Sequence, residues 1–145
     1  MTFEKDYEFG KEIRAWSVCI PENAAKEVAK TLTSTWINTG KKEREFRDKV
    51  CKRFNAPFAT ACMSGTSALK IALKALGVGH GDEVVSTPFT FIATNTAILE
   101  TGAIPVFADI LYDTLNIDPK SVEEKISKKT KAIMCVHYAG NPVDL

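Results

Sequence analysis

The strongest constraint on the fold is a regular alternation of short apolar segments with helical segments after residue 57. The predicted strands are residues 58–62, 83–86, 104–107 and 131–136, and the predicted helices between them are 66–76, 91–101 and 118–128. Two neighbouring parallel strands need a crossover connection, usually a helix, whereas a tight hairpin joins antiparallel strands. Strands that alternate with helices are therefore expected to pair in parallel. We therefore expect a partial α/β domain over residues 56–145, with a mostly parallel sheet and flanking helices.

The first 55 residues have a different pattern, with helical periodicity and no strand signal. Pro21 can occupy the first turn of a helix that runs to about Thr35, in which apolar residues recur at helical spacing. Residues 36–40 break that pattern with Asn and Gly, and a second helix follows, with Phe46, Val50 and Phe54 on one face. We expect residues 1–55 to be an N-terminal helical segment distinct from the α/β part.

Charge and composition exclude several classes of function. The net charge of +1 provides no field to attract nucleic acid or an anionic membrane. No apolar run approaches the roughly 20 residues that a membrane span requires, and residues 1–10 lack the apolar core of a signal peptide. The four cysteines form no CxxC pair, so no metal site is expected. These features favour a cytoplasmic protein without a nucleic-acid or membrane partner.

The segment 63–68 lies where a predicted strand ends and a helix begins. Gly65 permits a tight turn and the close approach of a ligand. The amides of Thr66 and Ser67 are expected to be unpaired at a helix N-terminus, where the helix dipole favours an anion. The segment therefore predicts a phosphate cradle without a lysine, although an ordinary capped strand-to-helix turn explains these few residues equally well.

Two further segments follow predicted strands, at the sheet edge where α/β proteins bind ligands. In residues 87–94, Phe89 or Phe91 could stack on a planar ring, and we expect the other to lie in the core. His137 is either an acid–base group or, more commonly, a hydrogen-bonded structural histidine. Residues 77–82 are glycine-rich but follow a helix, so they predict a helix cap and turn rather than a dinucleotide site.

The order and spacing of these motifs point to a known family. The relevant segments are residues 64–69, 76–84, 88–94, 102–110, 116–119, 130–133 and 136–142, with 36–40 and 45–46 before them. From about residue 12 to its end, the chain resembles the DegT/DnrJ/EryC1/StrS aminotransferases. The resemblance implies the N-terminal part of the large domain of a fold-type I transferase dependent on pyridoxal 5'-phosphate (PLP). It also implies a homodimer with active sites at the subunit boundary.

Members of this family move an amino group from glutamate to the keto group of a nucleotide-linked deoxysugar. Carried over to this chain, the resemblance assigns cofactor binding to Gly65, Thr66, Ser67 and Phe91, the first three at the phosphate and the last at the pyridine ring. It places Thr39 and Gly40 on the substrate side. His137 and Asn141 lie in a matching loop without an assigned role.

The resemblance also predicts what residues 1–145 lack. The family's aspartate at the pyridine nitrogen and its cofactor-binding lysine are expected beyond residue 145, so we expect no catalytic residue here and no activity from this segment alone. In the family, the strand at 58–62 pairs with a later part of the chain, and the other three strands form one group. Two alternatives stay open: a sugar dehydratase of the same family, with histidine replacing the lysine, and a truncated homologue that binds without catalysis. A Rossmann nucleotide-binding protein is disfavoured, because no acidic ribose ligand follows the phosphate turn.

Overall fold

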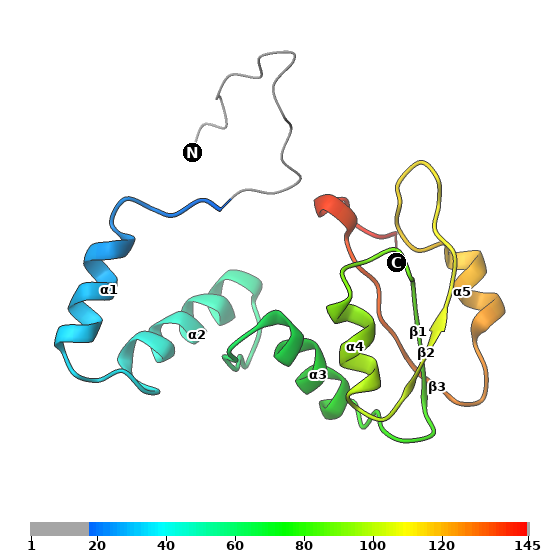
Figure 1. Ribbon diagram of the computed structural model, residues 1–145, viewed down its shortest axis with the longest axis horizontal. Helices are drawn as coiled ribbons and strands as arrows, with labels where there is room; N and C mark the ends of the chain where they lie inside the picture. Colours follow the sequence, from blue (N-terminus) through cyan, green and yellow to red (C-terminus); the bar gives the residue numbers. More distant parts are fainter. Residues whose placement is uncertain (1–17, 145) are drawn as a thin grey trace, which may run out of the picture. The chain divides into compact units, whose positions relative to one another are not determined.

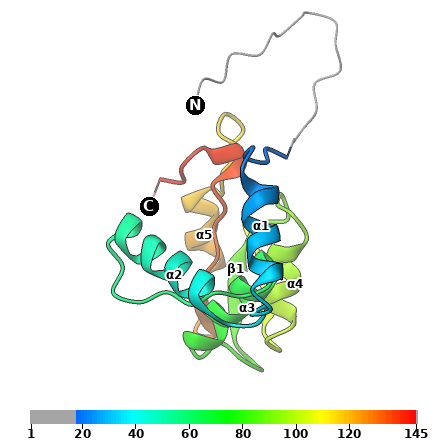
Figure 2. The ribbon, with the colours of Figure 1, turned by 90° about the vertical axis from the view of Figure 1, so that its left-hand side faces the viewer.

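Residues 18–144 are described by a computed structural model, in which the chain divides into two units, residues 1–56 and 57–145. The first unit contains two helices, α1 (Ala24–Thr33) and α2 (Lys41–Phe54), joined by a turn (Figures 1 and 2). Asn55 caps the C-terminus of helix α2. Its φ of 50° lies in the left-handed region, which Asn tolerates better than most residues. Both predicted helices are present, and α1 is shorter than its apolar pattern suggested.

The second unit is built on a three-stranded parallel sheet of order β2-β1-β3. Its strands are β1 (Glu83–Ser86), β2 (Ile104–Phe107) and β3 (Thr130–Ile133). The central strand β1 is the most buried, since both of its edges are paired. The α/β prediction is confirmed, as is the expectation that these three strands form one group.

Helices cover both faces of this sheet. They are α3 (Gly65–Ala75), α4 (Ala93–Leu99) and α5 (Pro119–Lys125). Val84 packs with α3 and α4 residues, whereas its neighbour Val85 packs with Val122 of α5, because successive strand side chains point to opposite faces. Figures 1 and 2 show α4 and α5 on opposite sides of the strands.

The glycine-rich segment after α3 is a helix cap, as predicted. Gly77 has a φ of +75°, and its amide donates to the carbonyl of Lys74 at 3.0 Å. The amide of Val78 donates to the carbonyl of Leu73, also at 3.0 Å. This pair of bonds is a Schellman motif, and the accompanying apolar contact is present because Leu73 and Val78 are both buried in one core.

The strand predicted at residues 58–62 is not present in the structure, so this prediction is wrong. Phe58 is 88% exposed. A strand is stable only when a neighbour accepts its backbone hydrogen bonds and its side chains pack across a sheet. Residues 58–62 pair with no strand among residues 18–144, so their apolar composition alone does not produce one.

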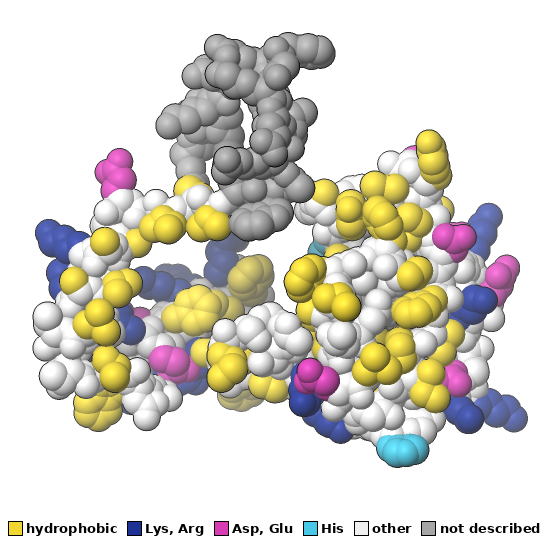
Figure 3. All heavy atoms as spheres, in the orientation of Figure 1, with side chains coloured by type: hydrophobic (Ala, Val, Ile, Leu, Met, Phe, Trp, Pro, Cys, Tyr) yellow, Lys and Arg dark blue, Asp and Glu magenta, His cyan; other side chains and the backbone are white. Residues whose placement is uncertain are grey.

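Apolar residues lie nearly all round α3 in the sequence, as in a helix that packs on both sides, but such packing is not observed. Leu73 is its one buried residue in the described part of the chain, while Ile71 is 47% exposed. The next residue after the helix, Leu76, is 63% exposed. Figure 3 shows hydrophobic side chains exposed on the visible face of the second unit. Helix α3 and the residue after it therefore carry more apolar side chains than the second unit buries.

Between residues 18 and 144, no helix is both long and apolar enough to cross a membrane. The same residues contain no group of three His, Cys, Asp or Glu side chains placed to hold a metal ion.

Candidate functional site

The N-terminus of α3 leaves two backbone donors available. Ser64 is the extended N-cap, and its Oγ accepts the amide of Ser67 at 3.2 Å. The two hydroxyls of Ser64 and Ser67 also lie 3.0 Å apart. The expectation that the Ser67 amide is free is therefore wrong, because the cap occupies it. Among residues 18–144, the amides of Gly65 and Thr66 have no acceptor, as is usual for a first helical turn.

Gly65 has open space where a side chain would begin. A Cβ built on this residue meets nothing within 4 Å. Its φ is not in the left-handed region, so the backbone conformation does not itself require glycine. What the absent Cβ provides is room directly beside the two free amides.

That room opens into a pocket of about 640 Å³ within the second unit. Three segments line it: the start of α3, the loop before α4, and the segment after β3. The lining residues are Gly65, Thr66, Ala68, Leu69, Thr90, Phe91, Ala93, Thr94, Val136, Tyr138 and Ala139. Three of the four predicted cofactor residues, Gly65, Thr66 and Phe91, thus meet at one pocket. Ser67 is not among its lining residues.

The two phenyl rings of the loop before α4 have different surroundings. Phe91 lines the pocket and is 78% exposed. Phe89 packs on Tyr138, with ring centroids 4.7 Å apart and planes tilted by 36°. We expected one ring to lie in the core, but Phe89 remains 39% exposed, so neither does.

Short-range hydrogen bonds fix the loop that carries Phe91. The hydroxyls of Thr90 and Thr94 lie 2.9 Å apart, and both residues line the pocket. Thr87 Oγ1 accepts the amide of Phe89 at 3.1 Å. Asn95 Nδ2 donates to the carbonyl of Thr87 at 3.0 Å, which connects the loop to α4. Of these residues, Asn95 is the one that lies outside the ligand segment 87–94 expected from the sequence.

His137 has a structural hydrogen bond. Its Nδ1 accepts the backbone amide of Val143 at 3.0 Å, and His137 is not among the residues that line the pocket. The structural interpretation of this histidine is therefore the one that the geometry supports. Its neighbours Tyr138 and Ala139, which sequence reasoning did not identify, form the pocket wall.

The two lysines of helix α3, Lys70 and Lys74, point away from the pocket. Lys70 Nζ pairs with Glu100 at 2.9 Å, and Lys74 Nζ donates to the carbonyl of Thr101 at 2.9 Å. Within the described part of the chain, no lysine lines this pocket. Neither Lys70 nor Lys74 therefore contributes to the pocket.

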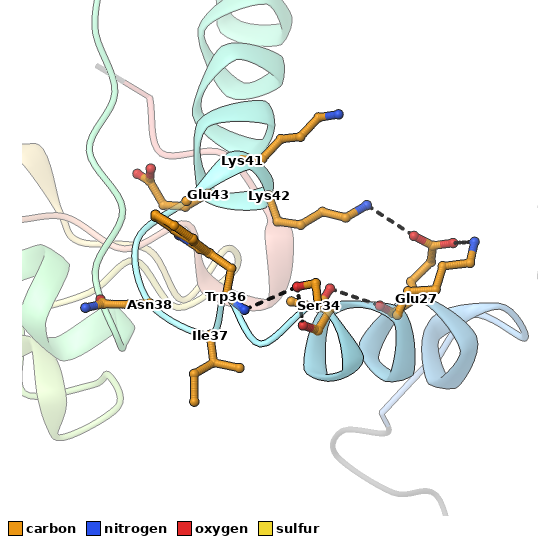
Figure 4. A pocket seen from close by; sticks show the side chains of 11 residues that line it. Glu27, Ser34, Trp36, Ile37, Asn38, Lys41, Lys42 and Glu43 are labelled. Carbon is orange, nitrogen blue, oxygen red and sulfur yellow. Dashed lines mark hydrogen bonds and ion pairs between the residues drawn. The ribbon is translucent and has the colours of Figure 1, made fainter.

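Thr39 and Gly40 lie in the first unit, where Gly40 lines a separate cavity of about 270 Å³ and Thr39 is not among the lining residues. Figure 4 shows this cavity. Trp36 Nε1 donates to the carbonyl of Thr39 at 2.9 Å. The indole of Trp36 also fills the space that a Cβ on Gly40 would need. Glycine at position 40 therefore has a local packing reason.

An ion pair joins the two helices beside this cavity, and Figure 4 shows it as a dashed line. Lys42 Nζ lies 3.1 Å from Glu27 Oε2, and Lys30 Nζ lies 2.7 Å from Glu27 Oε1. The hydrogen bond from Lys30, followed by that from Lys42, lowers the pKa of the Glu27 carboxyl. The hydrogen bond from Glu27 raises the pKa of Lys42.

Comparison with known proteins identifies the chain's relatives. Residues 18–145 match the DegT/DnrJ/EryC1/StrS aminotransferase family. The chain is 44% identical over 126 residues to the spore coat polysaccharide biosynthesis protein SpsC of Bacillus subtilis, an alignment that covers 87% of this chain and 32% of SpsC.

Solved structures agree with this match. An aminotransferase from Psychrobacter cryohalolentis is 40% identical, with a TM-score of 0.81 over 86% of this chain and 32% of that one. A Streptococcus pneumoniae protein, named as a sugar aminotransferase and solved in its PLP form, is 38% identical, with a TM-score of 0.82 over 87% of this chain and 32% of its own. The chain thus spans about a third of the length of the relatives that it matches.

Proposed function

Since the chain belongs to the DegT/DnrJ/EryC1/StrS aminotransferase family, we propose that residues 64–67 and Phe91 form part of the cofactor site of a PLP-dependent aminotransferase. The substrate is a nucleotide-linked keto-deoxysugar, and glutamate is the amino donor. One observation carries the proposal: Phe91 lines the same pocket as Gly65 and Thr66, from which it is distant in sequence.

The start of α3 fits a phosphate group. The amides of Gly65 and Thr66 are free among the described residues, and the absent Cβ of Gly65 lets an anion approach them closely. Helix α3 has 11 residues, enough for its dipole to add to the attraction. Ser67 contributes through its hydroxyl, which shares a hydrogen bond with that of Ser64.

The loop before α4 fits a planar ring. Phe91 lines the pocket and is 78% exposed, and Thr90 and Thr94, whose hydroxyls lie 2.9 Å apart, line the same pocket. Bound PLP supplies an electron sink for amine transfer, while the protein holds and orients the cofactor. We propose that these residues only bind, and that residues 1–145 alone are inactive, because the lysines nearest the phosphate turn are engaged by Glu100 and Thr101.

The remaining proposals concern substrate and assembly. We assign Thr39 and Gly40 to the substrate side, following the family resemblance. We propose a homodimer, and the exposed apolar residues Ile71 and Leu76 at α3 support a further packing partner. A cytoplasmic location agrees with the four cysteines, none of which forms a disulfide.

Ligand binding tests the cofactor assignment. Pyridoxamine 5'-phosphate is the appropriate probe, because it has no aldehyde to react with surface lysines. Calorimetric titration should show binding to the chain, and Gly65→Ala should weaken it on the order of tenfold, or about 1.4 kcal/mol. Gly79→Ala is the matched control, since a Cβ there also meets nothing within 4 Å but Gly79 does not line the pocket. Equal affinities for the two variants, or no binding by the unmodified chain, would contradict the assignment.

A further inference from the structure

Asn116 lies outside the pocket, shortly before α5, and is only 4% exposed. Its Nδ2 donates to the carbonyls of Asn141 and Pro142 at 3.2 and 3.0 Å. Its Oδ1 accepts the amide of Tyr138 at 3.1 Å. Both donors and the acceptor oxygen of this side chain are therefore used, as burial of an amide requires.

All three of these hydrogen bonds end on the backbone of one segment, residues 138–142. This segment brings Tyr138 and Ala139 into the pocket wall. Ala139 has a φ of 50°, a left-handed conformation that is unfavourable for a residue with a Cβ and must be held by its surroundings. Asn116 supplies hydrogen bonds on both sides of that residue.

The position of this segment also determines the ring contacts around the pocket. The ring of Tyr138 packs on Phe89, which belongs to the loop that carries Phe91. Asn116 therefore connects, through backbone hydrogen bonds, to the segment that contacts the loop carrying Phe91. It makes no contact with the phosphate turn in the hydrogen-bond network.

We propose that Asn116 is a positioning residue, which holds Tyr138 and Ala139 in place and so sets the pocket's affinity for the ring of its ligand rather than for the phosphate. The ring part of this inference rests on the proposed function. The positioning part stands on the hydrogen bonds alone. Two separate measurements therefore test it.

Amide hydrogen exchange tests the positioning. In Asn116→Ala, the amide of Tyr138 should exchange about tenfold faster or more, since it loses its buried acceptor. The amide of Ala108, which donates to Ser86 at 2.8 Å within the sheet, reports on global unfolding and should not change. Asn95→Ala is the matched control: it should affect the amide of Phe89, not that of Tyr138. If Tyr138 is unaffected, or changes only as much as Ala108, the inference is wrong.

A second variant distinguishes the acceptor oxygen of the Asn116 side chain from its donor nitrogen. It also provides a test of the positioning if Asn116→Ala does not fold. Asn116→Asp keeps an acceptor for Tyr138 but loses the donors to Asn141 and Pro142. Tyr138 should stay protected, while the amide of Val143, just beyond the released carbonyls, should exchange faster. Equal loss of protection at Tyr138, Val143 and Ala108 would indicate general destabilisation and would overturn the proposal.

Ligand titration tests the ring specificity. Asn116→Ala should bind pyridoxamine 5'-phosphate about tenfold more weakly than the unmodified chain and should bind inorganic phosphate equally well. A similar loss for both ligands would overturn the ring-specific role. If the unmodified chain binds neither ligand, the proposed function and the ring-specific role both fail, while the exchange measurements still decide whether Asn116 positions the segment.

Discussion

The rings of Phe89 and Tyr138 lie 4.7 Å apart and join two loops that are far apart in sequence. One loop carries Phe91 and the other carries Ala139, and both line the same pocket. The tilted geometry is one that aromatic pairs adopt readily. This contact connects two walls of the candidate site directly.

We predict that the pair contributes coupling energy beyond its buried area. Phe89→Leu and Tyr138→Leu keep apolar side chains but remove the ring–ring contact. A double-mutant cycle should give a coupling of about 1 kcal/mol in the free energy of unfolding, measured by denaturant titration. Strictly additive effects of the two substitutions would show that the ring contact does not stabilise the fold.

The sequence predicts the elements of this fold better than its loops. Residues 83–86 and 104–107 are identified as strands because short apolar runs stand between turn signals, and they are the observed bounds of β1 and β2. The strand expected at 58–62 fails because its stability depends on a partner and not on its own composition.

The site is predictable only where the signal is local. The spacing of Ser64 and Ser67 is that of an N-cap, which could have shown that the Ser67 amide is occupied. The contacts of Asn116 could not be read in this way, because they join residues distant in sequence and depend on tertiary packing. The local pattern pointed to Gly65 and to one of Phe89 and Phe91, and the family resemblance selected Phe91, while the binding role of these residues is still a prediction.

Gly40→Ala should disrupt the turn between α1 and α2. The new methyl group would occupy the position of the Trp36 indole, so the ring must move and its hydrogen bond to Thr39 should be lost. We expect a destabilisation of about 1–3 kcal/mol, as for other overpacked sites. The indole NH resonance of Trp36 should shift and exchange faster. The double variant Trp36→Ala/Gly40→Ala should show no further penalty from the methyl group, and a persistent penalty would contradict this explanation.

The ion pair of Glu27 and Lys42 should make the folding stability of the first unit weakly dependent on pH. The pKa of Glu27 is lowered in the folded state, so its contribution to stability is present above the ordinary value of 4.5 and is lost as the pH falls through the folded pKa. The pKa of Lys42 is raised, so its contribution is complete below 10.5 and is lost as the pH rises through the folded value. Between these limits the contribution should be constant.

Carboxyl carbon chemical shifts of Glu27, followed by NMR during an acid titration, measure this effect. Lys42→Gln should raise the midpoint of the Glu27 titration toward its ordinary value, and added salt should reduce the difference, since both groups are solvent-exposed. Lys52→Gln, in the last turn of α2, is the control and should leave the midpoint unchanged. An unchanged midpoint in Lys42→Gln would show that the ion pair is not formed in solution.

Residues 1–145 studied alone should associate or unfold at low denaturant concentration. Ile71 and Leu76 expose apolar surface at α3, and Phe58 exposes more in the segment before it. Burying such surface is worth roughly 25 cal/mol per Å², so self-association should be favourable at micromolar concentrations. Ile71→Lys should reduce the sedimentation coefficient and leave the far-ultraviolet circular dichroism unchanged, because Ile71 is not a buried residue of the core. A chain that sediments as a monomer and unfolds cooperatively, with no effect of Ile71→Lys, would show that this face needs no partner.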